Sequence, residues 1–448
     1  MLADALEPSL GTFFARKLFP RVVRSALLIL QLVTTSLAIE LLMALPMAMY
    51  FHRITAVALP VNILIVPLLG VLLPLALITL LLVLTIPKLA ALPAVGVALL
   101  LHAASGMVDI FGALRLGDVR IPAPRALAIA AIVLLTAAAL VLIRRTRFGI
   151  LMATAALGIA GIITVFPRPV EHRTGSLEVS TIDVGQGDSL LVITPDGKTL
   201  LIDAGGIVGP AGLSGGTPEQ NASNFDVGED VVSPVLWSRG IRQLDAVAIT
   251  HAHADHIGGM PAVLANFRPR ELWIGINPHS ALYDAVLAEA KATQTRLVRR
   301  TAGDLFTFDG VSVRILAPEP GYQPAATPGN NDSLVLQMRW GQTSALLEGD
   351  AESPSEARML ARGGLHSDLL KVGHHGSRTS TTPDFLAAVS PGYAAISVGR
   401  RNFYGHPRQE VLEQLQAAHV LTWRTDRLGL STFYLDGKRV QAAVWADQ

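Results

Sequence analysis

Long apolar runs fill the first third of the chain and end near residue 167. Short joints that carry charged residues or prolines separate them. Each run approaches or exceeds the ~20 apolar residues that an α-helix needs to cross a hydrocarbon core about 30 Å thick. The runs cover residues 26–51, 55–86, 90–113, 126–143 and 148–166. This pattern predicts a polytopic α-helical membrane domain over residues 1–167, with about five spans.

The second run is too long for one straight spanning helix, and it contains Pro60, Pro67 and Pro74. One interpretation is a broken helix, which a bilayer tolerates only where neighbouring helices or a water-filled cavity satisfy the freed backbone groups. The other interpretation is a long kinked helix with no role in transport. Polar side chains within the runs are functional candidates because they are costly to bury in lipid, and Glu40 and Asn62 are such candidates.

After Pro167 the pattern changes to short apolar runs bounded by glycine-rich or aspartate-rich turns, which is typical of strands. The turn Asp196-Gly197 predicts a tight hairpin, and residues 205–224 have the Gly, Ser and Asn content of a surface loop. Strands and helices mixed in this way predict a layered α/β domain over residues 168–448. The predicted strands are 177–183, 189–194, 199–203, 245–250, 311–316, 334–339, 344–347, 369–372 and 394–397, with helices at 283–293 and 409–419.

Composition agrees with a chain of two unlike parts. Hydrophobic residues make up 51% of the chain and charged residues 16%, whereas soluble domains carry about 25% charged residues. These values exclude a wholly soluble enzyme and a disordered scaffold. The chain has no cysteine, which excludes a disulfide framework, a thiol nucleophile and a thiolate-ligated zinc site.

The formal net charge of +1 hides a split between the two parts. Residues 1–165 hold 12 Lys and Arg against 5 Asp and Glu, a balance of +7, and the remainder holds 24 against 30, a balance of −6. Long-lived binding of nucleic acid normally uses a basic patch. The acidic remainder therefore favours either brief contact with nucleic acid or a different substrate.

Basic residues also predict an orientation, because cytoplasmic loops of membrane proteins carry an excess of Lys and Arg. Placing the two main clusters in the cytoplasm gives five spans and puts the α/β domain on the extracytoplasmic face of the inner membrane. Arg115, Arg120 and Arg125 would then lie outside as well, against the rule. No signal peptide is predicted, since the apolar region is far longer than an h-region. The two clusters are Arg16, Lys17, Arg21 and Arg24, and Arg144, Arg145 and Arg147.

The strongest chemical signal directly follows the apolar run 244–249. Four potential metal ligands lie there within six residues: His251, His253, Asp255 and His256. Imidazole and carboxylate donors suit zinc or manganese. One or two such ions can activate a water molecule and stabilise the oxygens of a displacement at phosphorus or carbonyl carbon.

Later strand ends deliver more residues of the same kinds. Asp350, the pair His374 and His375, and then His406 each follow a predicted strand. Asp350 can bridge two metal ions because a carboxylate has two oxygens to share. Together with the first cluster, these residues predict a site at one edge of a sheet sandwich.

These motifs resemble those of known families. His251–Gly259 is similar to the HxHxDH signature of the metallo-β-lactamase fold, and Asp203 is similar to the first motif of that superfamily. More specific segments resemble the ComEC family of DNA-internalisation proteins, in both the α/β part and the membrane part. Those segments are Asp183–Ser189, Leu369–Ser377, Asn402–Pro407, Phe51–Ile54, Pro60–Asn62 and Val66-Pro67. The resemblance implies an αββα sandwich after a competence-type membrane domain.

The resemblance also implies residue roles. Asp203 would orient a ligand histidine, and Asp255 is either a ligand or the general base towards the bridging water. His375 and His406 compete with His374 for the last ligand position, or contact phosphate and donate a proton to the leaving group. The implied metal ligands are His251, His253, Asp255, His256, Asp350 and His374.

Three further residues are implied to contact the phosphate backbone, namely Ser377, Arg378 and Arg401, although Arg401 and its neighbour Arg400 are also interpretable as a solvated pair. Two features depart from the family pattern. The resemblance implies that the chain begins partway through the competence domain. It is then either a truncated or split gene product, whose missing N-terminal portion another chain would supply, or a minimal variant. The segment Gly329–Ser333 has no histidine where many hydrolases of this fold have a ligand.

The implied function is uptake of single-stranded DNA across the membrane, with hydrolysis of the strand that is not imported. The chain has no GxxxxGK[ST] phosphate-binding loop, so a separate ATPase and separate DNA-receptor proteins are expected as partners. One alternative is a membrane-anchored metallo-hydrolase that acts on another extracytoplasmic phosphodiester or ester without transport. A second alternative is a channel whose metal domain is a vestigial gate.

Overall fold

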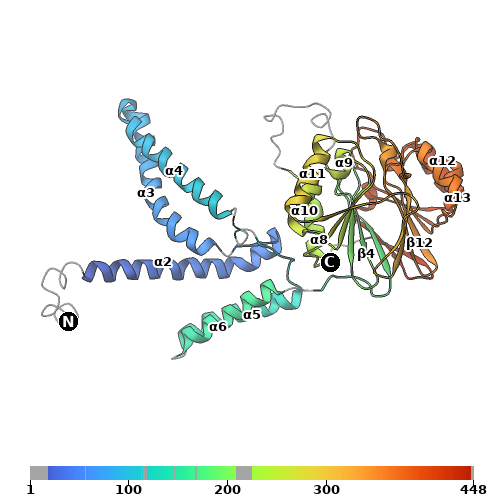
Figure 1. Ribbon diagram of the computed structural model, residues 1–448. Helices are drawn as coiled ribbons and strands as arrows, with labels where there is room; N and C mark the ends of the chain where they lie inside the picture. Colours follow the sequence, from blue (N-terminus) through green and yellow to red (C-terminus); the bar gives the residue numbers. More distant parts are fainter. Residues whose placement is uncertain are drawn as a thin grey trace. The chain divides into compact units, whose positions relative to one another are not determined.

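The computed structural model describes residues 19–55, 57–112, 114, 117, 119–145, 148–166, 169–207 and 225–444. Contacts divide the chain into two compact units, residues 1–167 and 168–448 (Figure 1). Some sequence-based predictions lie outside the described residues. These are the basic residues Arg16, Lys17, Arg115 and Arg147, and residues 208–224 of the predicted loop.

The first unit consists of apolar helices joined by short segments. Its helices expose most of their apolar side chains, as helices that face lipid do. Two short antiparallel strands, β1 (Arg53–Ile54) and β2 (Val119–Arg120), pair the segment before α3 with the segment before α5. The helices are α2 (Phe19–Pro46, extended by a π-helical turn at Met47–Phe51), α3 (Ala58–Thr85), α4 (Ala91–Gly112), α5 (Ala126–Arg145) and α6 (Gly149–Val165).

The number of spanning helices differs from the prediction. Among the described residues, four helices are long and apolar enough to cross a membrane, beginning at Phe19, Ala58, Ala91 and Ala126. The fifth predicted span is α6, which has 17 residues. At 1.5 Å per residue it is about 26 Å long, shorter than a hydrocarbon core of about 30 Å. The described residues thus contain four helices of spanning length and one shorter apolar helix, and the number of helices that cross the membrane stays a prediction.

The proline-rich second run forms one helix. α3 continues through Pro67 and Pro74, and Pro60 lies in its first turn, where the missing N–H has no intrahelical partner to lose. The second run is therefore one continuous helix rather than a broken one, and its role in transport stays a prediction. Glu40 in α2 and Asn62 in α3 are both half-buried, and their functional roles remain predictions.

The second unit is built on two mixed sheets. In the eight-stranded sheet β5 to β8 are parallel, and in the seven-stranded sheet β12 to β15 are parallel. The first sheet has the order β17 (Val440–Val444), β16 (Ser431–Leu435), β3 (Leu177–Thr181), β4 (Leu190–Ile193), β5 (Thr199–Ile202), β6 (Ala246–Ile249), β7 (Glu271–Ile274), β8 (Arg296–Arg299). The second has the order β15 (Leu421–Arg424), β14 (Tyr393–Ile396), β13 (Leu369–Lys371), β12 (Thr343–Leu347), β11 (Val335–Trp340), β10 (Val311–Ala317), β9 (Leu305–Phe308).

Helices cover the outer faces of both sheets, so the unit has four layers (Figure 1). One apolar cluster joins the inner faces of the two sheets, through side chains such as Val192 and Leu336. Two other clusters join each sheet to its helices. The helices are α8 (Ser233–Ser238), α9 (Ala254–Ile257), α10 (Met260–Phe267) and α11 (Ala281–Ala292) beside the first sheet, and α12 (Ser353–Arg362), α13 (Pro383–Val389), α14 (Gln409–Ala417) and α15 (Thr425–Leu428) in the second half. The predicted αββα sandwich is confirmed.

Phe433 should be a main contributor to sheet-on-sheet packing. It is fully buried and its ring contacts those of Tyr393 and Trp423 in the opposite sheet. We expect Phe433→Ala to lower the free energy of unfolding by about 3–5 kcal/mol. Urea unfolding of the full chain in detergent, followed by tryptophan fluorescence, measures this, because every tryptophan lies after residue 168. Leu305→Ala is the control, since Leu305 is 70% exposed, and equal shifts for the two variants would contradict the packing argument.

Candidate metal centre

The first half of the site lies where β5 and β6 end. Asp203 follows β5 with a positive φ of 59°, a conformation that aspartate tolerates better than most residues. Its carboxylate accepts hydrogen bonds from the Thr250 backbone N–H (2.9 Å) and hydroxyl (2.6 Å), and it lies 2.7 Å from His256 Nδ1. This arrangement places the proton of His256 on Nδ1 and turns Nε2 into the site.

The second half of the site comes from the ends of β12 and β13. Asp350 follows β12 and is buried, and His375 follows β13 in a 3₁₀ turn where its φ is 54°. His375 Nδ1 lies 2.9 Å from the carbonyl oxygen of Ser397, at the end of β14. Because a carbonyl only accepts, His375 donates from Nδ1 and presents Nε2 to the site.

Ligand atoms from both halves converge. His256 Nε2 lies 3.2 Å from Asp350 Oδ2, and His375 Nε2 lies 3.5 Å from the same oxygen and 3.5 Å from Asp255 Oδ2. Several of these buried atoms have no hydrogen-bond partner, including His256 Nε2, His375 Nε2 and Asp350 Oδ1. Buried polar atoms without partners are costly, so the donor set fits a divalent cation. Within the described residues, four sets of three ligand atoms lie within 4.8 Å of one another. Three of these sets join the two halves of the site: His251, His256 and Asp350; Asp255, His256 and His375; Asp188, Asp350 and His375. The fourth set, Asp188, Asp203 and His256, comes from the first half alone.

Some of the predicted histidine ligands belong to these sets of ligand atoms, and others lie outside them. His251 is buried and belongs to one of the three sets. His253 lies outside them, because its Nδ1 is 2.8 Å from His251 Nε2 and its Nε2 is 3.0 Å from the Pro328 carbonyl oxygen. His374 also lies outside them, with Nδ1 3.3 Å from Glu352 and Nε2 3.9 Å from Asp350. The geometry therefore favours His375 over His374 as the ligand from this turn.

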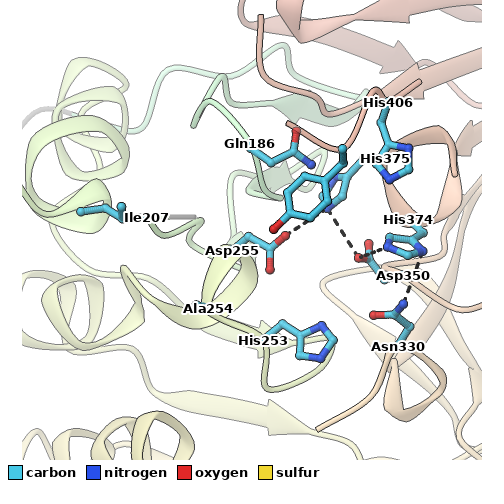
Figure 2. Close-up of a pocket in the computed structure, with 11 residues that line it drawn as sticks. Gln186, Ile207, His253, Ala254, Asp255, Asn330, Asp350, His374, His375 and His406 are labelled. Atoms are coloured by element: carbon cyan, nitrogen blue, oxygen red, sulfur yellow. Dashed lines mark hydrogen bonds and ion pairs between the residues drawn. The ribbon is translucent and has the colours of Figure 1, made fainter. Parts of the chain in front are cut away.

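A cavity of about 320 Å³ opens beside these atoms. Asp255, Asp350 and His375 point into it together with His374 and Asn330 (Figure 2). Asn330 comes from the segment that has no histidine, and its Nδ2 donates a hydrogen bond to Glu352 (3.0 Å). The other lining residues are Gln186, Ile207, His253, Ala254, Tyr404 and His406.

The predicted phosphate contacts lie outside the cavity lining. Ser377 is buried, and its hydroxyl is hydrogen-bonded to that of Thr379 at 2.9 Å. Arg378 and Arg401 are exposed and do not belong to the lining residues. Contact between these three side chains and a substrate remains a prediction.

Opposed charges shift the pKa values of the cluster. Burial lowers the pKa of His256, but the carboxylates of Asp350 and Asp203 outweigh burial and hold it well above the usual range. Burial raises the pKa of Asp350, and the neighbouring His375 and His256 bring it well below the ordinary value. The charged imidazole and carboxylate groups thus stabilise one another. A bound cation would replace the protons on the histidines.

Two other histidines remain neutral. Burial, with His256 as the next cause, lowers the pKa of His251 well below its usual range, which suits a ligand that must be deprotonated. Burial and the neighbouring His374 lower the pKa of His406 to about 4. His406 lines the cavity, and its role as a proton donor stays a prediction.

Sequence reasoning assigned no role to two buried charged residues beneath the cluster. Lys371 Nζ lies 2.7 Å from Asp188 Oδ2, and both side chains are 1% exposed. Asp188 Oδ1 lies 3.5 Å from His375 Nδ1. Burial lowers the pKa of Lys371, but the carboxylates of Asp188, Asp350 and Glu348 together raise it above its usual value. A lysine in an otherwise apolar strand was a signal in the sequence, because a buried lysine requires a partner.

Two known protein families match the chain, one in each unit. The profile described as "Metallo-beta-lactamase superfamily" matches residues 182–400, and the profile described as "Competence protein" matches residues 12–146. The chain thus carries a competence-protein match followed by a metallo-β-lactamase match, in the order that the resemblance to the ComEC family implies. The predicted resemblance is confirmed, and membership of the metallo-β-lactamase superfamily implies that the second unit binds divalent metal.

Individual relatives match part of their own length. The chain is 35% identical over 293 residues to "ComE operon protein 3" of Bacillus subtilis, covering 65% of this chain and 37% of that protein. It is 31% identical over 316 residues to "Competence protein ComA" of Neisseria gonorrhoeae, covering 69% and 39%. The chain thus spans less than half the length of these relatives. The metallo-β-lactamase fold protein YhfI from B. subtilis aligns with 12% identity and a TM-score of 0.35, over 55% of this chain and 95% of that one.

The buried ion pair should be essential to the site. We expect Lys371→Met to lower the free energy of unfolding by about 3–5 kcal/mol, because it leaves Asp188 uncompensated, and to weaken metal affinity by roughly 10–100-fold. Urea titration and metal titration of the full chain in detergent measure the two effects. Lys198→Met is the matched control. Its side chain is 48% exposed and its ion pair with Asp309 spans 3.7 Å, so a loss of about 0–1 kcal/mol is expected.

If Lys371→Met has the same free energy of unfolding and the same metal affinity as the unaltered chain, the ion pair with Asp188 supports neither the fold nor the metal site.

Proposed function

We propose that this chain acts in DNA uptake across the inner membrane, and that its second unit hydrolyses phosphodiester bonds of the strand that is not imported. The observation that carries the proposal is the convergence of buried imidazole and carboxylate atoms beside a cavity. The competence relatives and the apolar helices support the link to DNA and to a membrane. The nuclease step, the side of the membrane and the partners are part of the proposal.

The chain's own residues organise the reaction. Three sets of side chains would hold the metal: His251, His256 and Asp350; Asp255, His256 and His375; Asp188, Asp350 and His375. Divalent cations at such a site supply Lewis acidity and lower the pKa of a bound water molecule. Asp203 and the Ser397 carbonyl oxygen fix the orientation of His256 and His375. Asp255 lines the cavity, where its carboxylate can orient a water molecule and accept its proton.

The proposed uptake role includes separate partners. Import of a polyanion requires work, and the chain has no phosphate-binding loop of the GxxxxGK[ST] type. A separate ATPase and separate DNA-receptor proteins would supply the driving force and the capture step.

A second candidate function is a membrane-anchored metallo-hydrolase that acts on another extracytoplasmic phosphodiester or ester. The charge of the second part favours it, because 24 basic residues stand against 30 acidic ones after residue 165. Proteins that hold nucleic acid for long carry basic patches. A nuclease with brief contacts and a hydrolase of a smaller substrate both satisfy this balance.

Metal-dependent cleavage of DNA tests the proposal. We expect the full chain in detergent, supplied with Mn²⁺ or Zn²⁺, to cut a labelled DNA strand, and a chelator to abolish cutting. Asp255→Asn should lower the rate on the order of 10²-fold or more, because a positioned base contributes that much. Asp284→Asn is the control, since this carboxylate is 53% exposed and pairs only with the exposed His279 among its ion pairs in the described chain.

Metal content is measured on the same samples. A chain that retains metal, cuts no DNA and hydrolyses a small phosphodiester would favour the second candidate.

The orientation has its own test. An extracytoplasmic second unit requires α6 to cross the bilayer despite its length of about 26 Å, which local thinning permits. We expect a periplasm-active reporter fused after residue 448 to be active and a cytoplasm-active reporter to be silent. The opposite result would mean that four helices span and that the second unit lies in the cytoplasm.

A further inference from the structure

Two adjacent aromatic residues, Phe403 and Tyr404, are exposed, and the second of them lines the cavity. Phe403 is 83% exposed, the largest value for a large hydrophobic side chain among residues 169–207 and 225–444. The next residue, Tyr404, is 40% exposed and lines the cavity with Asp255 and His375. Its ring is nearly parallel to that of His406, with an interplanar angle of 6° and centroids 6.0 Å apart.

The loop that carries this pair is held in one shape. Asn402 donates hydrogen bonds from Nδ2 to the carbonyl oxygens of Gly399 (2.9 Å) and His406 (2.8 Å), and its Oδ1 accepts one from the His406 backbone N–H (2.9 Å). Gly399 in turn donates to the side chain of Gln186 at 3.2 Å. An aromatic ring held out to solvent by a fixed loop loses little conformational freedom when it binds a flat partner.

The surroundings indicate which flat partner this is. Arg400 and Arg401 precede the pair and are both exposed, so positive charge lies beside the rings within an otherwise acidic unit. Aromatic rings next to cationic side chains are the usual means of holding single-stranded nucleic acid, by stacking on bases and attracting phosphates. Bases within a duplex are stacked on one another, so only an unpaired base offers a free face.

We propose that Phe403 and Tyr404 form a stacking platform for unpaired bases, which selects single-stranded nucleic acid and places its backbone at the cavity; this rests on the proposed function. In this arrangement a base stacks on Phe403. Tyr404 extends the stacking surface to the cavity wall, which includes Asp255 and His375. Stacking of this kind tolerates any base sequence. It also explains how a unit of acidic balance engages DNA without a broad basic patch.

Binding by the full chain in detergent tests the platform. The probes are a fluorescent oligodeoxythymidine strand and the same strand built from abasic residues, followed by fluorescence anisotropy. We expect the unaltered chain to bind the thymidine strand more tightly than the abasic one. Phe403→Ala should weaken binding of the thymidine strand by roughly 5- to 150-fold, and the difference between the two proteins should disappear on the abasic strand. Phe403→Trp should retain tight binding.

Leu305→Ala is the matched control, because it removes another exposed apolar side chain, 70% exposed on β9. Equal affinity of the unaltered chain for the two strands overturns the platform. So does an equal loss on both strands in Phe403→Ala, which would mean that the ring supports the loop or meets a lipid surface. Cleavage of the same strands is measured separately. Base-dependent binding without cleavage would support the platform and reject the nuclease. Cleavage of both strands with equal KM would support the nuclease and reject the platform.

Discussion

The second unit depends on charge compensation at a buried junction between two sheets. Asp188, Asp203, Asp350, His256 and Lys371 are all nearly inaccessible to solvent, and an isolated charge in such a place would cost several kcal/mol. Each is therefore paired: Asp203 with His256, Asp350 with His256, and Asp188 with Lys371. These pairs join the ends of strands from both sheets.

The site has an inner part, whose residues orient the histidines, and an outer part, whose residues line the cavity. The inner residues orient imidazole rings and are themselves held by backbone groups, as Ser397 holds His375. The outer residues, such as Asp255 and Asn330, line the cavity and face a substrate. The inner part sets the geometry, and the outer part is free to determine which bond is broken.

Much of this arrangement was readable from the sequence. Most of the buried parallel strands were predicted to within about two residues because they are apolar runs with clear turns, and the first cluster was found because its ligands are close in the chain. Two interior strands, β7 and β16, were missed. The edge strands β8, β9, β15 and β17 were also missed; edge positions are half-solvated, and Arg296–Arg299 and Leu421–Arg424 carry charged residues at their ends. The choice between His374 and His375 could not be made, because two adjacent residues in a tight turn differ only through φ and ψ. Lys371 was overlooked because its partner, Asp188, is distant in sequence.

The division of the site between the two sheets has a consequence for biosynthesis. The first sheet supplies His256, Asp203 and Asp188, and the second supplies Asp350, His375 and Lys371, which follow or lie in strands made much later. Asp188, Asp203 and His256 form a set of donors within the first half, whereas every set that includes Asp350 or His375 draws atoms from both halves. A ribosome-bound or half-folded chain therefore lacks Asp350 and His375, which line the cavity. The full set of donors beside the cavity is assembled only when the two sheets have closed on each other, so hydrolysis by this unit would have to follow complete folding.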